Sequence, residues 1–425
     1  MLKGKLLPER YMPRLMDSKL SGYLDIFGAV EVAGPMWCGK TWTSMAFGES
    51  MSRVGTSAVR TMAEADPTTV LFGDKPHVID EWQDVPQIWD EVRAKIDENV
   101  GVPGQYILTG SSIPNKEKVY HSGAGRIQKL HMSTMTLFEA GKSSGRISLA
   151  KLFDGEFETC LVQQKLAPLA EYICQGGWPS LIEKKKTDST PFLNSYLNAL
   201  LSVSLPRKGL KANEGRKVLK SIARNLGCAL NVTTITSDVG FTDKKQTDLY
   251  INAFEELYVI QPLGGWDAPI RSKSRLRIKP KYYFADPSIA ANLLNMTPER
   301  LLSEGQIFGL LFESLCLHDL SVYASLLPNI GDSPLYYYRD SDGLEVDAII
   351  ELNDGRWAAF ECKLGENKVE DAAKSLNRLK NKVLLNPAAK NREPEFLAVL
   401  VGAGELARYD KDLGIYIIPI TALGA

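Results

Sequence analysis

The residues with the clearest chemical signature lie together near the N-terminus. In order they are Gly34, Pro35, Met36, Trp37, Cys38, Gly39, Lys40 and Thr41. This run has the phosphate-loop spacing G-x-x-x-x-G-K-[ST], in which glycines let backbone N–H groups face the phosphates. The lysine then reaches the β and γ oxygens, and the threonine hydroxyl binds Mg²⁺. We therefore predict that the run binds ATP and that Thr41 is a metal ligand.

Two adjacent acids end the short apolar segment 77–79, downstream of the loop. In P-loop ATPases the first acid completes the Mg²⁺ shell and the second polarises the attacking water. We assign these roles to Asp80 and Glu81, with Asp80 as the second metal ligand, and we expect their strand to neighbour the strand of the phosphate loop. The alternative is a pair of solvated acids at a strand end, which the upstream loop makes the weaker interpretation.

Hydroxyl and guanidinium groups extend this candidate catalytic set. Thr109 ends a predicted strand, 105–109, and Ser111 follows it, where a hydroxyl can sense the γ-phosphate or hold the water. Hydroxyls after a strand are also common turn formers. Arg126 precedes another predicted strand and is a candidate arginine finger, acting in cis or in trans within a homo-oligomer. An arginine at a strand start also serves as a surface ion pair, and both interpretations stay open.

These residues require a framework of strands and helices to position them. The apolar run 29–33 is a predicted strand before the loop, and 41–51 is a predicted helix whose N-terminus favours anions. Parallel strands alternating with helices indicate an α/β fold, a P-loop NTPase with a doubly wound parallel sheet. The nucleotide then binds at the carboxyl ends of the strands. We expect this ATPase core, with an N-terminal helix, to span residues 1–145.

Further segments carry a resemblance to a known family. They are Tyr11-Met-Pro-Arg14, Ile79-Asp-Glu-Trp-Gln-Asp-Val-Pro86, Ile107-Leu-Thr-Gly-Ser-Ser112 and Gly176-Gly-Trp-Pro-Ser180. With the phosphate loop they resemble the bacterial and archaeal AAA-type P-loop ATPases that carry a C-terminal winged-helix and PD-(D/E)XK nuclease-like region. The resemblance covers most of the chain and implies a helical lid over 146–205. Met36 stands where the family often has arginine, which removes one phosphate contact.

The region 206–290 has the outline of a winged helix–turn–helix. Its pattern has three helices and two extended segments, at 217–226, 231–240, 242–257, 258–263 and 276–284. Winged helices bind nucleic acid or serve as contacts for a protein partner. The outline by itself leaves both functions open.

Charged residues in this region favour DNA as the partner. Cations alternate in its second half: Arg271, Lys273, Arg275, Arg277, Lys279 and Lys281. In an extended strand this spacing puts every cation on one face. Lys244 and Lys245 begin the third predicted helix, where residues that enter a DNA groove lie. We therefore predict contact with DNA phosphates, the alternative being lysines that protect a sheet edge.

The last predicted domain, 291–425, is α+β and carries a second chemical constellation. A predicted helix containing Glu313 precedes predicted strands at 335–338, 345–350 and 357–363. This order is the layout of a PD-(D/E)XK nuclease core, which the family resemblance also implies. Asp347 and Glu361 would hold Mg²⁺, Lys363 would orient the water, and Glu313 would assist. The alternative to DNA cleavage is a nucleotide-gated switch whose nuclease-like domain only docks DNA or protein.

Composition bounds the remaining possibilities. The chain has 425 residues, 44% of them hydrophobic, and a formal net charge of −1, so no overall field draws it to nucleic acid or membrane. No apolar run reaches the roughly 18 residues of a membrane span. The 6 cysteines form no C-x-x-C pair, which argues against a zinc site and a disulfide framework. We expect a cytoplasmic protein.

Overall fold

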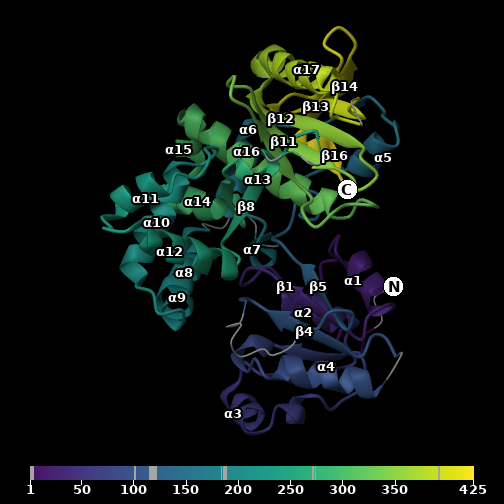
Figure 1. Cartoon of the computed structure of the whole chain (residues 1–425), viewed down its shortest axis with the longest axis vertical. Coiled ribbons are helices and arrows are strands. Elements are labelled where there is room, and N and C mark those ends of the chain that lie inside the picture. Colours follow the sequence, from purple (N-terminus) through teal and green to yellow (C-terminus); the bar gives the residue numbers. More distant parts are fainter. Residues whose placement is uncertain are drawn as a thin grey trace. The chain divides into compact units, whose positions relative to one another are not determined.

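A computed structural model describes residues 4–99, 102–113, 122–182, 184, 189–269, 272, 274–390 and 393–425. The chain forms two compact units (Figure 1). Unit 1 comprises Met1–Thr134 and Glu256–Val259, and unit 2 comprises Met135–Glu255 and Ile260–Ala425. The predicted ATPase core, 1–145, therefore extends past the end of unit 1. The three later predicted domains, 146–205, 206–290 and 291–425, all fall in unit 2.

Unit 1 is built on a parallel sheet. Its strands in the described part of the chain are β1 (Ala29–Ala33), β2 (Ser50–Arg53), β3 (His77–Asp80), β4 (Tyr106–Gly110) and β5 (Ile127–His131). They lie in the order β2-β3-β4-β1-β5, and each neighbouring pair is parallel. Buried aliphatic residues fill β1, β3 and β4, which form the middle of the sheet. The predicted parallel α/β sheet is confirmed.

One prediction about this sheet is wrong. The acid strand β3 does not neighbour the loop strand β1, because β4 pairs with both and lies between them. In the register of β3 and β4, Asp80 lies opposite Thr109. The intervening strand therefore brings a hydroxyl to the acid, which two directly paired strands could not have done.

Helices connect these strands. They are α1 (Asp17–Leu24), α2 (Lys40–Phe47), α3 (Ser57–Ala65) and α4 (Ile88–Glu98). α2 is shorter than the predicted helix 41–51, because Gly48 adopts extended backbone after its last turn and the chain continues into β2. β2 carries Ser50, Ser52 and Arg53 at the edge of the sheet, so it lacks the apolar pattern that predicts a strand.

Unit 2 is built on a mixed sheet. Its strands in the described residues lie in the order β7-β14-β15-β13-β12-β11-β10-β8-β9. They are β7 (Cys160–Leu161), β8 (Ile260–Gly265), β9 (Lys281–Phe284), β10 (Tyr336–Arg339), β11 (Glu345–Glu351), β12 (Trp357–Gly365), β13 (Phe396–Ala403), β14 (Leu406–Asp410) and β15 (Ile415–Pro419). α17 (Val369–Leu385) packs on this sheet through an apolar core that includes Trp357, Leu376 and Val399. Figure 1 shows α17 lying along β13.

The remaining helices of unit 2 surround this sheet and extend away from it (Figure 1). They are α5 (Leu149–Phe153), α6 (Leu166–Gln175), α7 (Pro179–Ile182), α8 (Thr190–Ala199), α9 (Leu205–Arg207), α10 (Ala212–Arg224), α11 (Val232–Val239), α12 (Lys244–Glu256), α13 (Ser274–Arg277), α14 (Pro287–Leu293), α15 (Pro298–Ser303) and α16 (Gly305–Ala324). α16 is the one helix in the described residues with the length and apolar composition of a membrane span, and 61% of that window is buried inside the protein. Such burial is typical of a core helix.

The segment predicted as a separate lid, 146–205, is joined to the C-terminal end of the chain. β6 (Ile147–Ser148) pairs with β16 (Leu423–Gly424), and β7 pairs with β14 at one edge of the large sheet. The helices of this segment include α6 and α8. A lid that moved as one body would have to break both strand pairs.

The predicted three helices and hairpin are present as α10, α11, α12, β8 and β9. The two strands are antiparallel neighbours, and β8 also pairs with β10, so the hairpin extends the large sheet. The predicted strand 276–284 is wrong over its first half, because Ser274–Arg277 is helical and the strand begins at Lys281. The alternating cations therefore do not share one strand face. Arg271 and Lys273 lie outside the described residues.

Candidate functional site

The phosphate loop joins β1 to the N-terminus of α2. Gly34 has no space for a side chain, since a Cβ there would lie 2.0 Å from the Met132 carbonyl oxygen. Gly39 has a φ of 107° at the N-cap of α2, a conformation that side chains disfavour. Close packing at one end and a left-handed turn at the other thus explain both glycines.

The side chains of the loop divide into buried and exposed groups. Lys40 is buried, and its Nζ donates a hydrogen bond of 2.8 Å to the Pro35 carbonyl oxygen. Cys38 is fully buried and Met36 half-buried, whereas Trp37 is 43% exposed. The ammonium group therefore lies inside the curve of the loop, where phosphate oxygens would be its natural partners.

The acid of β3 contacts the threonine of the loop. Thr41 Oγ1 donates to Asp80 Oδ1 at 2.8 Å, and Thr109 Oγ1 donates to the same oxygen at 2.7 Å. Hydroxyl and carboxylate oxygens are the hard ligands that Mg²⁺ takes together with nucleotide phosphates. Thr41 and Asp80 therefore fit the predicted magnesium site.

The second acid is held by polar groups on the neighbouring strand end. Glu81 has a φ of 57°, and its N–H donates to Thr109 Oγ1 at 3.1 Å. Its carboxylate accepts a 3.0 Å hydrogen bond from Ser111 Oγ and a short one from the Gln83 amide. The structure thus brings Asp80, Glu81, Thr109 and Ser111 together. Gln83 was not assigned from the sequence, although it lies within the family-like segment 79–86.

Arg126 lies at the end of the parallel strands opposite to the phosphate loop. It precedes β5, whereas the phosphate loop follows the carboxyl end of the parallel strand β1. Its Nε pairs with Asp97 at 2.8 Å, and its side chain is 47% exposed. Within its own chain Arg126 takes the ion-pair role, because it is at the wrong end of the strand to reach the loop. Action in trans stays a prediction.

Arg14 belongs to this site and was not assigned from the sequence. Its guanidinium is buried and donates 2.9 Å hydrogen bonds to the carbonyl oxygens of Cys38 and Ser133. It therefore ties the backbone of the phosphate loop to the chain that follows β5. The available signal was its place in the segment 11–14 that carries the family resemblance.

Glu256–Val259 packs within unit 1 although the chain before and after it belongs to unit 2. The Ile113 N–H donates to the Glu256 carbonyl oxygen at 2.9 Å, and Lys129 Nζ donates to the Tyr258 hydroxyl at 2.7 Å. Tyr258 is buried and has a φ of 54°, a strained backbone for a tyrosine. The end of α12 is therefore attached next to Ser111, the candidate γ-phosphate sensor.

The predicted C-terminal residues also converge, where β11 and β12 part. The ladder between these strands runs as far as Ala348 and Phe360, and the next residues outward are Asp347 and Glu361. Beyond the ladder, Asp347 Oδ2 accepts a hydrogen bond of 2.8 Å from the Cys362 N–H. Lys363 Nζ lies 3.3 Å from Asp347 Oδ2 and forms a closer ion pair with Glu361.

Glu313 approaches this cluster from α16. Burial and, after it, the charge of Asp347 raise the pKa of Glu313 to about 7. The Tyr283 hydroxyl donates to Glu313 Oε1 at 2.8 Å, and Lys281 Nζ lies 3.7 Å from the same oxygen. Lys281 was predicted to face outward from a basic strand, and the structure places it inside the cluster instead, because β9 turns its first side chain inward.

Among the residues that the structure describes, no group of three or more His, Cys, Asp or Glu side chains is arranged to hold a metal ion. At the phosphate loop, the predicted magnesium site has one carboxylate ligand, and the nucleotide would supply further oxygen ligands. At the C-terminal cluster, the prediction that Asp347 and Glu361 hold Mg²⁺ requires only two carboxylates and stays a prediction.

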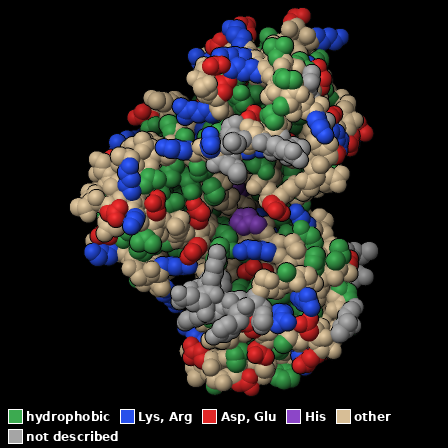
Figure 2. All heavy atoms as spheres, viewed as in Figure 1, with side chains coloured by type: hydrophobic (Ala, Val, Ile, Leu, Met, Phe, Trp, Pro, Cys, Tyr) green, Lys and Arg blue, Asp and Glu red, His purple; other side chains and the backbone are tan. Residues whose placement is uncertain are grey.

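The predicted nucleic-acid residues separate into two groups. Lys244 and Lys245 are exposed in the first turn of α12, and Arg277 is exposed on α13. Arg275 instead forms a bidentate pair with Glu351, at 2.7 and 2.9 Å, so its guanidinium is engaged inside unit 2. On the face drawn in Figure 2, basic and acidic side chains are interspersed, in keeping with the net charge of −1.

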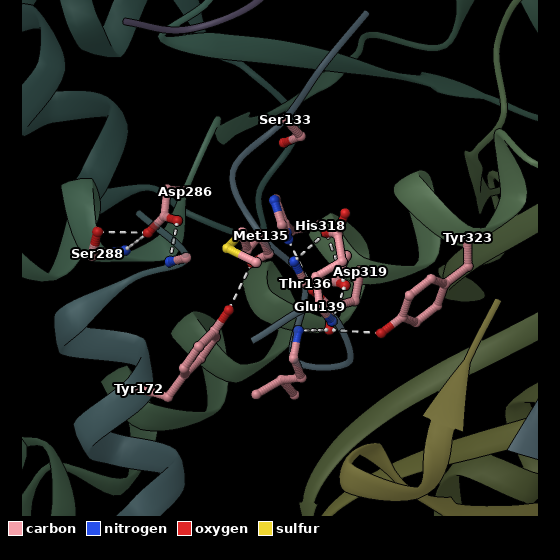
Figure 3. A network of polar contacts seen from close by, with 12 residues as sticks. Ser133, Met135, Thr136, Glu139, Tyr172, Asp286, Ser288, His318, Asp319 and Tyr323 are labelled. Atoms are coloured by element: carbon pink, nitrogen blue, oxygen red, sulfur yellow. Dashed lines mark hydrogen bonds and ion pairs between the residues drawn. The ribbon is translucent and has the colours of Figure 1, made fainter. Parts of the chain in front are cut away.

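A buried polar network lies at the start of unit 2 (Figure 3). The Tyr172 hydroxyl donates to the Met135 carbonyl oxygen at 2.7 Å, and Asp319 accepts from the Leu137 N–H at 3.0 Å. Asp319 also pairs with His318 at 2.9 Å. These contacts hold the first residues of unit 2 against α6 and α16. The sequence did not predict this network, because the residues that form it are far apart along the chain.

The Gly176-Gly177 turn belongs to the same region. Gly176 ends α6 with a φ of 78°, as a helix stop requires. The Gly177 N–H donates to Asp286 Oδ2 at 2.8 Å, and a Cβ on Gly177 would lie 2.0 Å from the Met135 carbonyl oxygen. The family-like segment 176–180 thus serves close packing around the network.

Comparison with known proteins divides the chain into three parts. Residues 27–140 match a family model described as an AAA domain. Residues 166–300 and 308–423 match two domains of unknown function, DUF8612 and DUF4143. The uncharacterized protein Rv2008c of Mycobacterium tuberculosis is 27% identical over 345 residues, 79% of this chain and 70% of that protein. The uncharacterized protein Mb2031c of Mycobacterium bovis matches to the same extent.

Solved structures give weaker likenesses. The Walker-type ATPase PABY2304 of Pyrococcus abyssi has a TM-score of 0.41 at 12% identity, covering 69% of this chain and 99% of that one. The RuvB Holliday junction branch migration motor of Thermotoga maritima has a TM-score of 0.27 at 15% identity, covering 60% and 92%. Scores this low assign no role to any residue. The loop motif, the parallel sheet and the family-model match together show that residues 27–140 form an AAA-type P-loop ATPase domain.

Proposed function

We propose that unit 1 binds and hydrolyses ATP with Mg²⁺. The observation that carries the proposal is the convergence of Thr41 and Thr109 on one oxygen of Asp80, at 2.8 and 2.7 Å, beside a phosphate loop whose Lys40 is buried. Bound Mg²⁺ would offset the charge of the phosphates. Lys40 would exchange its loop carbonyl partner for phosphate oxygens. Glu81, oriented by Ser111 and Gln83, would polarise the attacking water.

Lys40→Ala tests this proposal. Loss of the ammonium group removes a charge that stabilises the transferring phosphoryl group, so Mg²⁺-dependent ATP hydrolysis should fall by about 100-fold or more. Lys95→Ala, which changes an exposed lysine of α4, is the matched control and should hydrolyse ATP at the wild-type rate. Hydrolysis by Lys40→Ala at the control rate would contradict the proposal.

We infer further that nucleotide binding is coupled to DNA binding through α12. Two observations support this inference. Lys244 and Lys245 are exposed at one end of the helix. At its other end, the Glu256 carbonyl oxygen accepts a hydrogen bond from the Ile113 N–H, two residues after Ser111. Coupling is reciprocal for binding equilibria. Duplex DNA should therefore change the affinity for an unhydrolysable ATP analogue by a certain factor, and the analogue should change the affinity for DNA by the same factor. Equal affinities with and without the second ligand would leave α12 as a protein contact or a structural helix.

The nuclease-like arrangement of Glu313, Asp347, Glu361 and Lys363 supports two candidate functions. One is DNA cleavage with a divalent cation, which Lys363→Ala should abolish without changing ATP hydrolysis. The other is a nucleotide-gated switch in which the C-terminal fold docks DNA or protein without cutting it. The pairing of buried Lys281 with Glu313 favours the second, because a protein cation is already in contact with one acid of this arrangement.

A further inference from the structure

The C-terminal cluster contains a lysine that its nuclease-like pattern does not include. Lys281, the first residue of β9, is 1% exposed. Its Nζ lies 3.7 Å from Glu313 Oε1 and forms a close ion pair with Glu345. The Tyr337 ring lies beneath the ammonium group, 5.0 Å from Nζ to the ring centroid. A lysine buried to this degree is tolerated only where acids and hydrogen bonds replace its water shell.

The charge of Lys281 is maintained by its neighbours. Burial acts to lower the pKa of Lys281, but the carboxylates of Glu313, Glu345 and Asp347 outweigh that effect and raise it. The side chain is therefore an ammonium ion. It pairs with Glu313 and with Glu345, which lies two residues before Asp347 on β11. Lys363 makes a second such ammonium on the other side of Asp347.

Two lysines together supply the charge of one divalent cation. Lys281 faces Glu313 and Glu345, and Lys363 faces Asp347 and Glu361. The Coulombic need that Mg²⁺ would meet in a group of acids is thus met by side chains of the protein itself. Each of these four acids thus has a lysine ammonium group within ion-pair distance.

One oxygen of each candidate ligand is also occupied. Asp347 Oδ2 accepts from the Cys362 N–H at 2.8 Å and from Lys363 Nζ at 3.3 Å, and Glu361 Oε2 is paired with Lys363. Mg²⁺ requires near-octahedral oxygens at about 2.1 Å and usually keeps several waters. To bind here it would have to displace Lys363 from both acids while Lys281 remained paired with Glu313 and Glu345. The donor set therefore does not fit a magnesium ion.

We propose that Lys281 is an internal counter-ion that takes the place of a divalent cation, and that the C-terminal cluster is a metal-free ion-pair core. This inference is independent of the nucleotide site in unit 1. Its consequence is that no metal-dependent strand cleavage takes place at Asp347 and Glu361.

Direct measurement of Mn²⁺ binding by electron paramagnetic resonance tests the proposal. The full-length protein is used without nucleotide and with Asp80→Asn, which removes the carboxylate of the unit 1 site. In this background, Lys281→Met frees Glu313 and Glu345 and should gain one Mn²⁺ in the low millimolar range, and adding Glu345→Gln should remove it. Lys279→Met is the matched control, because it changes an exposed lysine two residues away in the sequence, and it should gain none.

Two results would overturn the proposal. One is a Mn²⁺ ion bound with Lys281 intact and lost on Asp347→Asn, since the site would then accept a metal beside the lysine. The other is a folded Lys281→Met that binds no more Mn²⁺ than Lys279→Met. If Lys281→Met does not fold, Mn²⁺ binding is compared between the protein that retains Lys281 and the same protein with Asp347→Asn. That comparison alone then tests the proposal. Thermal melting adds a second readout: Mn²⁺ should raise the melting temperature of Lys281→Met and leave that of Lys279→Met unchanged.

Discussion

The phosphate-loop site and the C-terminal cluster both gather acids at strand ends, but they differ in what those acids contact. Asp80 accepts hydrogen bonds from two hydroxyl groups, at 2.8 and 2.7 Å. Asp347 accepts from a backbone N–H at 2.8 Å and lies 3.3 Å from an ammonium group. Hydroxyls can remain beside a bound cation as ligands, whereas an ammonium group repels it. The first arrangement fits the proposed Mg²⁺ site, whereas the acids of the second are already paired with ammonium groups.

This difference leads to opposite expectations for substitutions. At the nucleotide site, changes should alter turnover and leave stability nearly intact, because the hydroxyls can rearrange around a missing acid. At the C-terminal cluster, removal of one charge leaves its partner buried and unpaired, so stability should suffer first. This distinction between the sites is wrong if substitutions at both sites change turnover and stability in the same way.

The largest expected effect is on catalysis at Glu81. Glu81→Gln keeps the size and the hydrogen-bonding reach of the side chain but removes the base that polarises water, so ATP hydrolysis should fall by about 1,000-fold. The affinity for ATP, measured by calorimetry, and the melting temperature should be close to wild type. Glu64→Gln on the exposed side of α3 is the control. A loss of ATP affinity that accounts for the whole defect would assign Glu81 to binding.

The next effect tests the opposite site. Lys363→Met leaves Asp347 and Glu361 without their shared cation, so the free energy of unfolding of unit 2 should fall by about 3 kcal/mol. ATP hydrolysis by unit 1 should not change. Denaturant titration followed by circular dichroism measures the loss. Lys374→Met, which breaks an exposed pair with Asp371, should cost less than about 1 kcal/mol; equal losses would remove the distinction between a core and a surface ion pair.

The third prediction concerns the exposed end of α12. Replacing Lys244 and Lys245 by Glu should weaken binding of duplex DNA by about ten-fold and reduce the slope of log affinity against log salt by about 2, one unit for each lost phosphate contact. Fluorescence anisotropy over a salt series measures both quantities. Lys220→Glu, on an exposed position of α10, is the control. An unchanged salt slope would favour the protein-partner alternative.

A smaller effect is expected at Arg14, which acts on the phosphate loop through its backbone. Arg14→Ala removes the hydrogen bonds to the carbonyl oxygens of Cys38 and Ser133, so the KM for ATP should rise several-fold while kcat changes little. Arg14→Lys should restore part of the affinity, since one of the two bonds can be remade. Arg10→Ala, an exposed change in the same segment, should be silent. A fall in kcat without a change in KM would contradict a positioning role.

The smallest effect is a pH dependence from Glu313. Its pKa in the folded protein is raised from 4.5 to about 7, by burial and by the charge of Asp347, so the folded state holds this proton more tightly than the unfolded state. Glu313 therefore contributes stability below pH 4.5, and this contribution is lost as the pH rises to about 7. Glu313→Gln cannot titrate and should flatten that decline. Melting temperatures of both proteins over this range provide the test, and parallel curves would contradict it.

Much of unit 1 could be predicted because its signals are local. The spacing from Gly34 to Thr41 and the apolar strand ending at Asp80 determine which backbone groups meet a phosphate and which acid follows. The strand order could not be predicted, since β4 enters between β1 and β3 by long-range pairing. That insertion brings Thr109 to Asp80. Arg14 was missed because its partners are backbone oxygens, which leave no trace in residue types.

In unit 2 the sequence predicted helices and strands correctly in many places, but the surroundings predicted for some charged side chains were wrong. Helical and extended patterns located α10, α11, α12, α16 and the strands from β10 to β12, because hydrophobic periodicity reports one buried face of each element. Periodicity does not say whether a charged residue faces water or another charge. Alternation at 271–281 was therefore interpreted as one basic strand face, whereas Arg275 pairs with Glu351 and Lys281 lies among acids.

The sequence by itself determined the phosphate loop, its acid pair and the acids and lysine of the C-terminal pattern, since these depend on residue type and short spacing. Only the tertiary structure decided that hydroxyls surround Asp80 and that Lys281 joins the acids of β11 and α16. The physical reason is that the interaction of a charge depends on the partners within a few ångströms. In this protein those partners come from strands and helices far apart along the chain.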